Sequence, residues 1–316
     1  MKRLPLTGRI AVVAGATRGA GRGIACALGE AGATVYCTGR SVRGEPATKG
    51  RPETIEETAE MVTGRGGKGI AVRCDHTKES DVKKLAARIQ REKKGRLDIL
   101  VNDVWGGDAL TEFGKTFWQV SLDKGLKMLE QAVHSHIITN RLVAPLLVKR
   151  GSGLIVEITD GDFFGYRGNL FYDLVKSSVV RLAMIMAYEL RKTNITALAV
   201  TPGFLRSEAM LEHFGVSEAN WRDVGKKEPD FLHSETPTFV GRAVAALAAD
   251  PNVKKKSGQV FSSWALSEEY GFTDADGSRP HWGRHFAETY GTYPKFDETL
   301  YRLFPGPGSL VFPDWP

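Results

Sequence analysis

The stretch RIAVVAGATRGAGRGIACALGEAG, residues 9–32, decides the expected fold. An apolar strand pattern stops at Gly15, and a helix pattern then runs up to Gly32. The turn between them also carries Gly19 and Gly21, so the backbone can approach a pyrophosphate at the helix N-terminus, where free N–H groups and the helix dipole favour anions. Strand, glycine turn and helix together predict a dinucleotide-binding unit.

Strand and helix patterns keep alternating along the chain. Further strands are predicted at Thr34–Thr38, Gly69–Cys74, Asp98–Asn102, Gly153–Ile158, Thr196–Thr201 and Gln259–Ser262, and helices at Pro52–Thr63, Glu79–Lys94, Gly125–Arg150 and Tyr172–Lys192. This alternation is typical of βαβ units. We therefore predict an α/β fold, a doubly wound parallel sheet of the Rossmann type with about seven strands and helices on both faces.

One catalytic and dinucleotide-binding domain is expected over residues 1–265, with a lid lobe around residues 204–237. The remaining segment, residues 266–316, is rich in Trp, Tyr and Phe among prolines and glycines. Exposing so many aromatic side chains to water is unfavourable. We therefore predict that this C-terminal extension packs on the pocket or on a neighbouring subunit.

The amino-acid composition and charge argue against several classes of function. The 316 residues carry a formal charge of +6, but the basic residues are dispersed, so no nucleic-acid partner is expected. The three cysteines are isolated, and no apolar run is long enough for a signal sequence or a membrane span, which favours a cytoplasmic protein without a membrane partner. His134 and His136 lie two residues apart on a predicted helix and do not share a face, so no metal site is predicted.

The end of the second strand indicates which dinucleotide binds. An acid there would hold the ribose 2′-hydroxyl of NAD, but the strand runs into Arg40 and Ser41. Arg18 in the glycine turn adds a second guanidinium that could meet a 2′-phosphate. The sequence therefore favours NADP, with NAD as the alternative.

A helix after the fifth strand begins with Tyr172 and Lys176, which lie one turn apart on the same face. A positive charge beside a phenol favours the phenolate, so we expect Lys176 to lower the pKa of Tyr172 toward neutrality. The two residues form a candidate proton-transfer pair.

Several motifs, in this order, resemble those of the short-chain dehydrogenase/reductase family: GATRGAG from Gly15, Asp75 in RCDHT, VNDVWG from Val101, YDLVK from Tyr172 and TPGFLRS from Thr201. The resemblance covers Thr7 to Ser263. Two longer stretches, GRGIACALGEAGATVYCTGR and SGQVFSSWALSEEYGFTDADG, resemble the subgroup of dehydrogenase/reductase member 1.

The resemblance implies hydride transfer between a nicotinamide and a carbonyl or alcohol, with Tyr172 as acid/base and Lys176 on the nicotinamide ribose. It also implies a homodimer or homotetramer and a small-molecule substrate. The residues expected to contact the cofactor are Gly15, Thr17, Arg18, Gly19, Gly21, Arg40, Ser41, Asp75, Asn102, Tyr172, Lys176, Pro202, Gly203 and Ser207.

The family also implies a serine before the tyrosine, but this chain has Thr159 and Asp160 there. In one hypothesis, a dry pocket lined by Phe163, Phe164 and Trp105 keeps Asp160 protonated, so that it donates to a carbonyl. In a second, Asp160 is ionised and pairs with an amine or iminium, which makes the protein an imine reductase or a reductase of amine-bearing carbonyls. In a third, Thr159 supplies the hydroxyl and Asp160 is structural.

A second departure concerns the helix asparagine that supports the family's proton relay. The matching position falls near Ala132, and the nearby asparagine is Asn140. Both departures leave open a different class of function, a catalytically silent NADP-binding sensor or structural subunit.

Overall fold

The computed structural model describes residues 4–161 and 166–291. Its centre is a parallel sheet with strand order β3-β2-β1-β4-β5-β6-β7. The strands are β1 (Ile10–Ala14), β2 (Thr34–Gly39), β3 (Lys68–Arg73), β4 (Ile99–Asn102), β5 (Ser152–Ile158), β6 (Asn194–Thr201) and β7 (Val260–Ser262). The predicted doubly wound α/β fold is confirmed.

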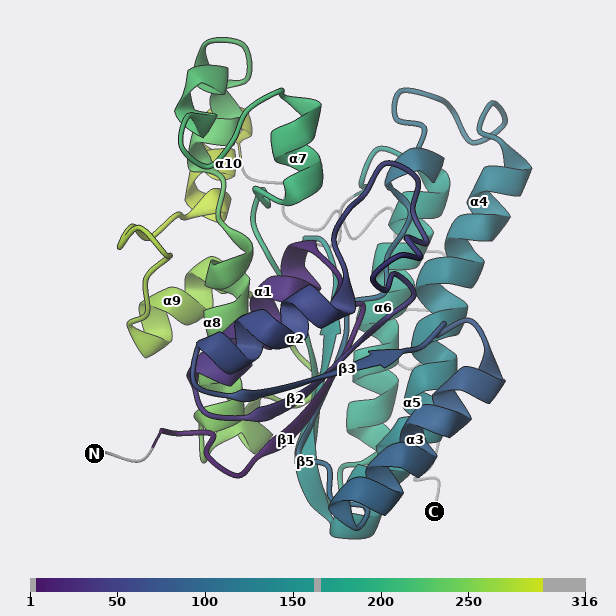
Figure 1. Cartoon of the computed structure of the whole chain (residues 1–316). Coiled ribbons are helices and arrows are strands. Elements are labelled where there is room, and N and C mark those ends of the chain that lie inside the picture. The colour runs from purple at the N-terminus through teal and green to yellow at the C-terminus, as the bar shows by residue number, and fades with distance from the viewer. Residues whose placement is uncertain (1–3, 162–165, 292–316) are drawn as a thin grey trace, which may run out of the picture.

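Helices cover both faces of the sheet (Figure 1). The α-helices are α1 (Gly19–Glu30), α2 (Ile55–Gly64), α3 (Glu79–Lys93), α4 (Leu122–Leu129), α5 (Ser135–Arg150), α6 (Leu170–Glu189), α7 (Glu208–His213), α8 (Pro237–Ala249), α9 (Ser263–Tyr270) and α10 (Trp282–Tyr290). The short elements are the 3₁₀ helices η1 (Asp108–Leu110), η3 (Trp221–Lys226), η4 (Pro229–His233) and η5 (Val253–Lys256) and the π turn η2 (Glu130–His134).

The core has two layers, one on each side of the sheet. Val13 of β1 packs in the layer with α1 and α8, whereas its neighbour Val12 packs in the layer with α3 and α5. Successive side chains of a strand point to opposite faces, so a strand covered on both faces must be apolar throughout. This explains the continuous apolar run that precedes the glycine turn.

The predicted helix from Gly125 to Arg150 is interrupted. It is divided into α4 and α5 by the π turn η2, which contains the buried Ala132. A π turn uses more residues per turn than an α-helix and rotates the side chains that follow it. His136 and Asn140 follow the turn, and both side chains reach Glu157 on β5.

These residues form a buried polar network. Oε1 of Glu157 accepts hydrogen bonds from the amide nitrogens of Asn102 and Asn140, both at 2.7 Å. His136 places Nε2 at 3.1 Å from the Val104 carbonyl oxygen, which can only accept, so Nε2 carries a proton. Nδ1 of His136 and Oε2 of Glu157, 2.5 Å apart, then share one further proton. The network ties β4, β5 and α5 together beneath the cleft.

Residues 204–237 fold into short elements above the sheet, α7, η3 and η4. Their side chains form a separate apolar cluster built around the buried Trp221 and Phe231. Helix α10 packs on this lobe: the rings of Phe204 and Trp282 lie 5.5 Å apart, and the hydroxyl of Tyr290 donates to Asp230 at 2.6 Å. The other aromatics of the C-terminal extension, from residue 292 onward, lie outside the described residues, and the domain division stays a prediction.

Among residues 4–161 and 166–291, no helix has the length and apolar character needed to cross a membrane.

A buried carboxyl group, that of Glu235, joins the lobe to the sheet. Its Oε2 accepts hydrogen bonds from the Gly203 backbone at 2.9 Å and from the Ser263 hydroxyl at 2.5 Å. Oε1 is buried and has no hydrogen-bond partner in the part of the chain that the structure describes. Burial raises the pKa of Glu235 to about 8, because the charged form loses its hydration.

This pKa predicts how stability depends on pH. The folded pKa lies above the unfolded value of about 4.3, so the contribution of Glu235 is fully present below that value and is lost as pH rises through about 8. The slope reaches at most about 1.4 kcal/mol per pH unit. Urea unfolding of wild type and of Glu235→Gln between pH 5 and 9 should show a steeper decline in wild type, because the variant lacks the contribution of Glu235 and keeps only that of other groups such as Asp103.

The control is Glu60→Gln, which removes an exposed carboxylate paired with Arg43. Its stability curve should run parallel to that of wild type. Parallel curves for wild type and Glu235→Gln would contradict the assignment.

Candidate active site

Helix α6 carries the predicted proton-transfer pair at the carboxyl edge of the sheet. The side chain of Asn169, directly before the helix, accepts hydrogen bonds from the backbone N–H groups of Phe171 and Tyr172, both at 3.0 Å. This cap fixes where the helix starts. Tyr172 and Lys176 therefore occupy its first two turns, beside the end of β5.

The structure distinguishes between the two residues that stand in place of the family serine. Tyr172 donates its hydroxyl hydrogen to Oδ2 of Asp160 at 2.6 Å. Thr159 donates its hydroxyl instead to the backbone carbonyl of Lys176 at 2.9 Å and is buried. The Thr159 hydroxyl is already used to bind α6, which favours Asp160 over Thr159 as the residue that acts with Tyr172; the alternative in which Thr159 offers its hydroxyl to a substrate stays a prediction.

The expected effect of Lys176 on Tyr172 is also wrong. Burial raises the pKa of Tyr172 well above its usual range, and the charge and hydrogen bond of Asp160 raise it further. The ammonium of Lys176 lies 5.5 Å from the centre of the tyrosine ring, whereas the carboxylate of Asp160 touches the phenol oxygen. Burial also lowers the pKa of Lys176. The nearer carboxylate outweighs the more distant ammonium.

Aromatic rings surround this group. Trp105 and Phe113 contact the Tyr172 ring edge-on, with centroid distances of 5.4 and 5.5 Å. The Lys176 ammonium lies 4.3 Å from the centre of the Trp105 ring, which is a cation–π contact. Phe163 and Phe164, which were expected in the same wall, lie outside the described residues.

A further carboxyl group, that of Asp103, faces the glycine turn from the end of β4. Burial raises the pKa of Asp103 to about 7, while the charges of Lys176 and His136 and a hydrogen bond from the Gly21 backbone oppose the rise. Asp103 therefore lies between the glycine turn and Lys176 of α6.

The glycine turn fits a dinucleotide. A Cβ on Gly15 would lie 2.3 Å from the carbonyl oxygen of Asp103, and a Cβ on Gly21 would lie 2.3 Å from that of Gly15, so side chains are excluded at both positions. The first turn of α1 contains no acidic residue. Gly19 donates its backbone N–H to the carboxylate of Glu208 at 2.8 Å, so the turn already holds an anionic group.

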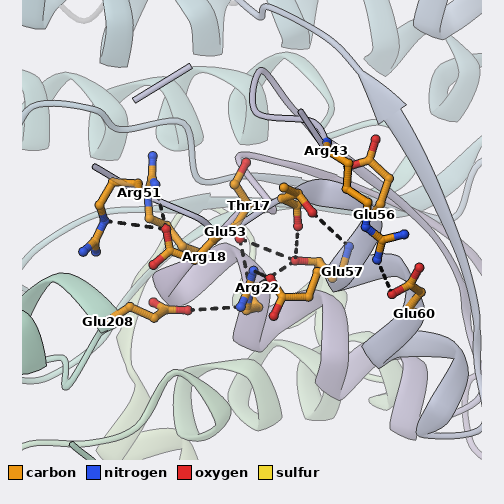
Figure 2. Close-up of polar contacts among 12 residues, drawn as sticks. Thr17, Arg18, Arg22, Arg43, Arg51, Glu53, Glu56, Glu57, Glu60 and Glu208 are labelled. Atoms are coloured by element: carbon orange, nitrogen blue, oxygen red, sulfur yellow. Dashed lines mark hydrogen bonds and ion pairs between the residues drawn. The ribbon is translucent and has the colours of Figure 1, made fainter. Parts of the chain in front are cut away.

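Basic residues lie at the end of β2, where a 2′-phosphate is expected (Figure 2). Arg18 contacts Glu53 at 3.2 Å and the hydroxyl of Thr48 at 2.7 Å. The guanidinium of Arg40 makes no ion pair with any residue in the described ranges, and a Cβ on Gly106 would lie 3.7 Å from it. Of the two predicted guanidinium groups, that of Arg18 therefore already has partners, whereas that of Arg40 has no ion pair among the described residues.

Several other predicted cofactor residues have structural contacts. Ser41 accepts a hydrogen bond from the Ala47 backbone at 3.1 Å, and Asp75 accepts from the hydroxyl of Thr77 at 2.7 Å. Ser207 caps α7 by accepting from the backbone of Met210 at 3.4 Å. Asn102 donates a hydrogen bond to Glu157 in the buried network. Gly203, which follows Pro202, donates its backbone N–H to Glu235, and the backbone carbonyl of Thr17 accepts a hydrogen bond from Arg22.

Sequence reasoning missed Glu157, Glu53, Arg51 and Glu208. A signal existed for Glu157, because an acid inside the apolar strand LIVEI must find a partner when the strand is buried. No local pattern marks the other three, which come together from different segments.

Comparisons with known proteins agree with this geometry. The family model for short chain dehydrogenase matches residues 9–214. Dehydrogenase/reductase SDR family member 1 of Mus musculus is 37% identical over 277 residues, which cover 86% of this chain and 85% of the relative. The Homo sapiens protein of the same name is 35% identical over 276 residues, with the same coverage. The predicted resemblance to this subgroup is confirmed.

A solved structure, that of hydroxysteroid dehydrogenase from Escherichia coli, superposes with a TM-score of 0.65 at 25% identity and covers 83% of this chain and 97% of its own. The strand order, the glycine turn and the tyrosine and lysine on α6 fit this relationship. The chain belongs to the short-chain dehydrogenase/reductase family of oxidoreductases.

Proposed function

We propose that the protein is an NADP(H)-dependent oxidoreductase that interconverts a carbonyl and an alcohol, with Tyr172 as acid/base. The observation that carries the proposal is the contact of Tyr172 with Asp160 beside the half-buried Lys176. When bound, the nicotinamide supplies or accepts the hydride. Arg18 and Arg40 would hold the 2′-phosphate, and the glycine turn would hold the pyrophosphate.

The proton path follows from the Asp160–Tyr172 contact. A phenolate left at Tyr172 would be repelled by an ionised carboxylate 2.6 Å away. Carbonyl reduction therefore requires Asp160 to be protonated: Tyr172 gives its proton to the carbonyl oxygen, and Asp160 passes its own proton to Tyr172. Solvent then replaces one proton. Lys176 stabilises negative charge that develops on this pair.

The same contact supports a second candidate function. In the structure Tyr172 is the donor to Asp160, which is the arrangement that holds an ionised carboxylate. An ionised Asp160 would pair with a cationic amine or iminium, and an iminium carbon accepts a hydride without a further proton. The aromatic walls formed by Trp105 and Phe113 suit such a cation.

Replacing Tyr172 by Phe tests whether the site is catalytic. Loss of the acid/base should lower kcat by about 10²- to 10⁴-fold, while the NADPH dissociation constant stays within about twofold because the ring remains. NADPH oxidation with a panel of aldehydes, ketones and cyclic imines measures the effect. Tyr188→Phe, on the exposed side of the same helix, is the matched control.

Two results would contradict the catalytic proposal. One is turnover by Tyr172→Phe at the wild-type rate. The other is wild-type protein that binds NADPH but turns over no member of the panel, which would support the silent sensor or structural subunit.

Replacing Asp160 by Asn separates carbonyl from imine chemistry. For a carbonyl, the variant keeps a hydrogen-bond donor to Tyr172 but has no proton to pass to it, so kcat should fall while KM stays near the wild-type value. For an imine, the variant should lose the ion pair and most of its activity. Separate measurements of kcat and KM for the carbonyls and the cyclic imines test this, with Asp123→Asn as the control.

If Asp160→Asn has the wild-type kcat and KM for every substrate, neither role of Asp160 holds.

We also propose that the protein forms a homodimer or homotetramer through α5 and α6. Both helices expose large apolar side chains on their outer surfaces, namely Ile137, Val148, Leu174, Met184, Ile185 and Tyr188. An exposed apolar surface of this kind is typical of a subunit interface.

Ile185→Glu should therefore dissociate the assembly, because it buries a charge in an apolar interface. Multi-angle light scattering measures the mass, and Leu4→Glu, which changes an exposed apolar residue elsewhere, is the control. A wild-type protein that is monomeric at micromolar concentration would contradict the proposal.

A further inference from the structure

Helix α7 carries two acids, Glu208 and Glu212, four residues apart and therefore on one face. Glu208 reaches the glycine turn, where its Oε2 accepts the backbone N–H of Gly19 at 2.8 Å. Its Oε1 forms an ion pair with Nη1 of Arg22 at 3.7 Å. Figure 2 draws the contact between Glu208 and Arg22. This acid therefore occupies the anion position at the start of α1.

The second acid reaches the basic residues at the end of β2. Glu212 forms an ion pair with Nη1 of Arg51. Arg51 and Arg18 lie on either side of Glu53, at 3.6 and 3.2 Å from its Oε2. Nη2 of Arg51 is buried and has no hydrogen-bond partner among the residues that the structure describes. Glu53 thus orients two guanidinium groups, and one of them retains an unused donor.

We propose that α7 is an internal competitor of the cofactor: Glu208 occupies the pyrophosphate position at Gly19, and Glu212 occupies the 2′-phosphate position at Arg51. NADP(H) binding displaces both acids and releases α7, and Arg51 joins Arg18 as a ligand of the 2′-phosphate. The inference rests on the proposed NADP(H) function and deepens it, since it assigns a specificity residue, Arg51, that lies 11 positions beyond the predicted Arg40.

The competition follows from charge and geometry. The single N–H of Gly19 cannot serve a carboxylate and a phosphate at once, and two anions at this distance repel each other. The observed affinity for the cofactor is then lowered by the fraction of molecules in which α7 is docked. Six residues are too few for a stable isolated helix, so α7 depends on contacts such as these.

Release of α7 also affects the lobe formed by residues 204–237. The helix is capped by Ser207 and packs through Met210 and Leu211 on the apolar cluster of that lobe. Cofactor binding therefore weakens the packing of α7 on this cluster.

The test compares dissociation constants for NADPH and NADH, measured by nucleotide fluorescence. Glu208→Gln should tighten both dinucleotides by about 3- to 10-fold, because both carry the pyrophosphate. Glu212→Gln should tighten NADPH alone by a similar factor, and Arg51→Gln should weaken NADPH alone. Glu57→Gln is the matched control, since Glu57 also pairs with Arg22 but makes no contact with Gly19.

Hydrogen exchange of residues 208–213 gives an independent readout. NADPH should speed exchange in wild type, and the double variant Glu208→Gln/Glu212→Gln should exchange fast without NADPH. Unchanged or weaker NADPH binding in both acid variants, or slower exchange on NADPH binding, overturns the inference alone. A wild-type protein that binds neither dinucleotide overturns the proposed function and this inference with it.

Discussion

The hydrogen bond between Tyr172 and Asp160 is the interaction on which the chemistry of this site depends. Where the family has a serine hydroxyl, this chain places a carboxyl group against the phenol, and the charge and hydrogen bond of Asp160 raise the pKa of Tyr172. The rings of Trp105 and Phe113 contact the Tyr172 ring and partly shield this pair from water. The ammonium of Lys176 then acts on the pair as a whole.

The sheet beneath the site holds several buried carboxyl groups in defined hydrogen bonds. Glu157 is satisfied by Asn102, Asn140 and His136, whereas Asp103 and Glu235 are held with pKa values raised to about 7 and about 8 by burial. Glu157 lies near the carboxyl end of β5, Asp103 follows β4, and Glu235 lies shortly before α8. The raised pKa values of Asp103 and Glu235 make the charge of this part of the molecule depend on pH.

Much of the fold could be predicted from the sequence, because strand–helix alternation and the glycine turn are local patterns. The start of α2 is a small exception: Thr54 caps the helix by accepting from the backbone of Glu57, so it begins at Ile55 rather than Pro52. The site was less predictable. The sequence placed Tyr172 beside Lys176 but did not reveal which of Thr159 and Asp160 reaches it, since that depends on how β5 ends against α6. Glu212 and Arg51 form an ion pair although 161 positions separate them in the sequence, and no local pattern indicates such a contact.

The central claim is that Tyr172 delivers a proton while a hydride passes to the substrate carbon. The most direct measurement follows deuterium from NADPH labelled at the nicotinamide C4, with a carbonyl and imine panel and mass spectrometry of the products. The account predicts one deuterium on the reduced carbon of the wild-type product from one of the two C4-labelled epimers, and about 10²- to 10⁴-fold less labelled product from Tyr172→Phe in the same time. Reduced product without deuterium from either C4-labelled epimer, or equal labelling by the variant, would contradict it.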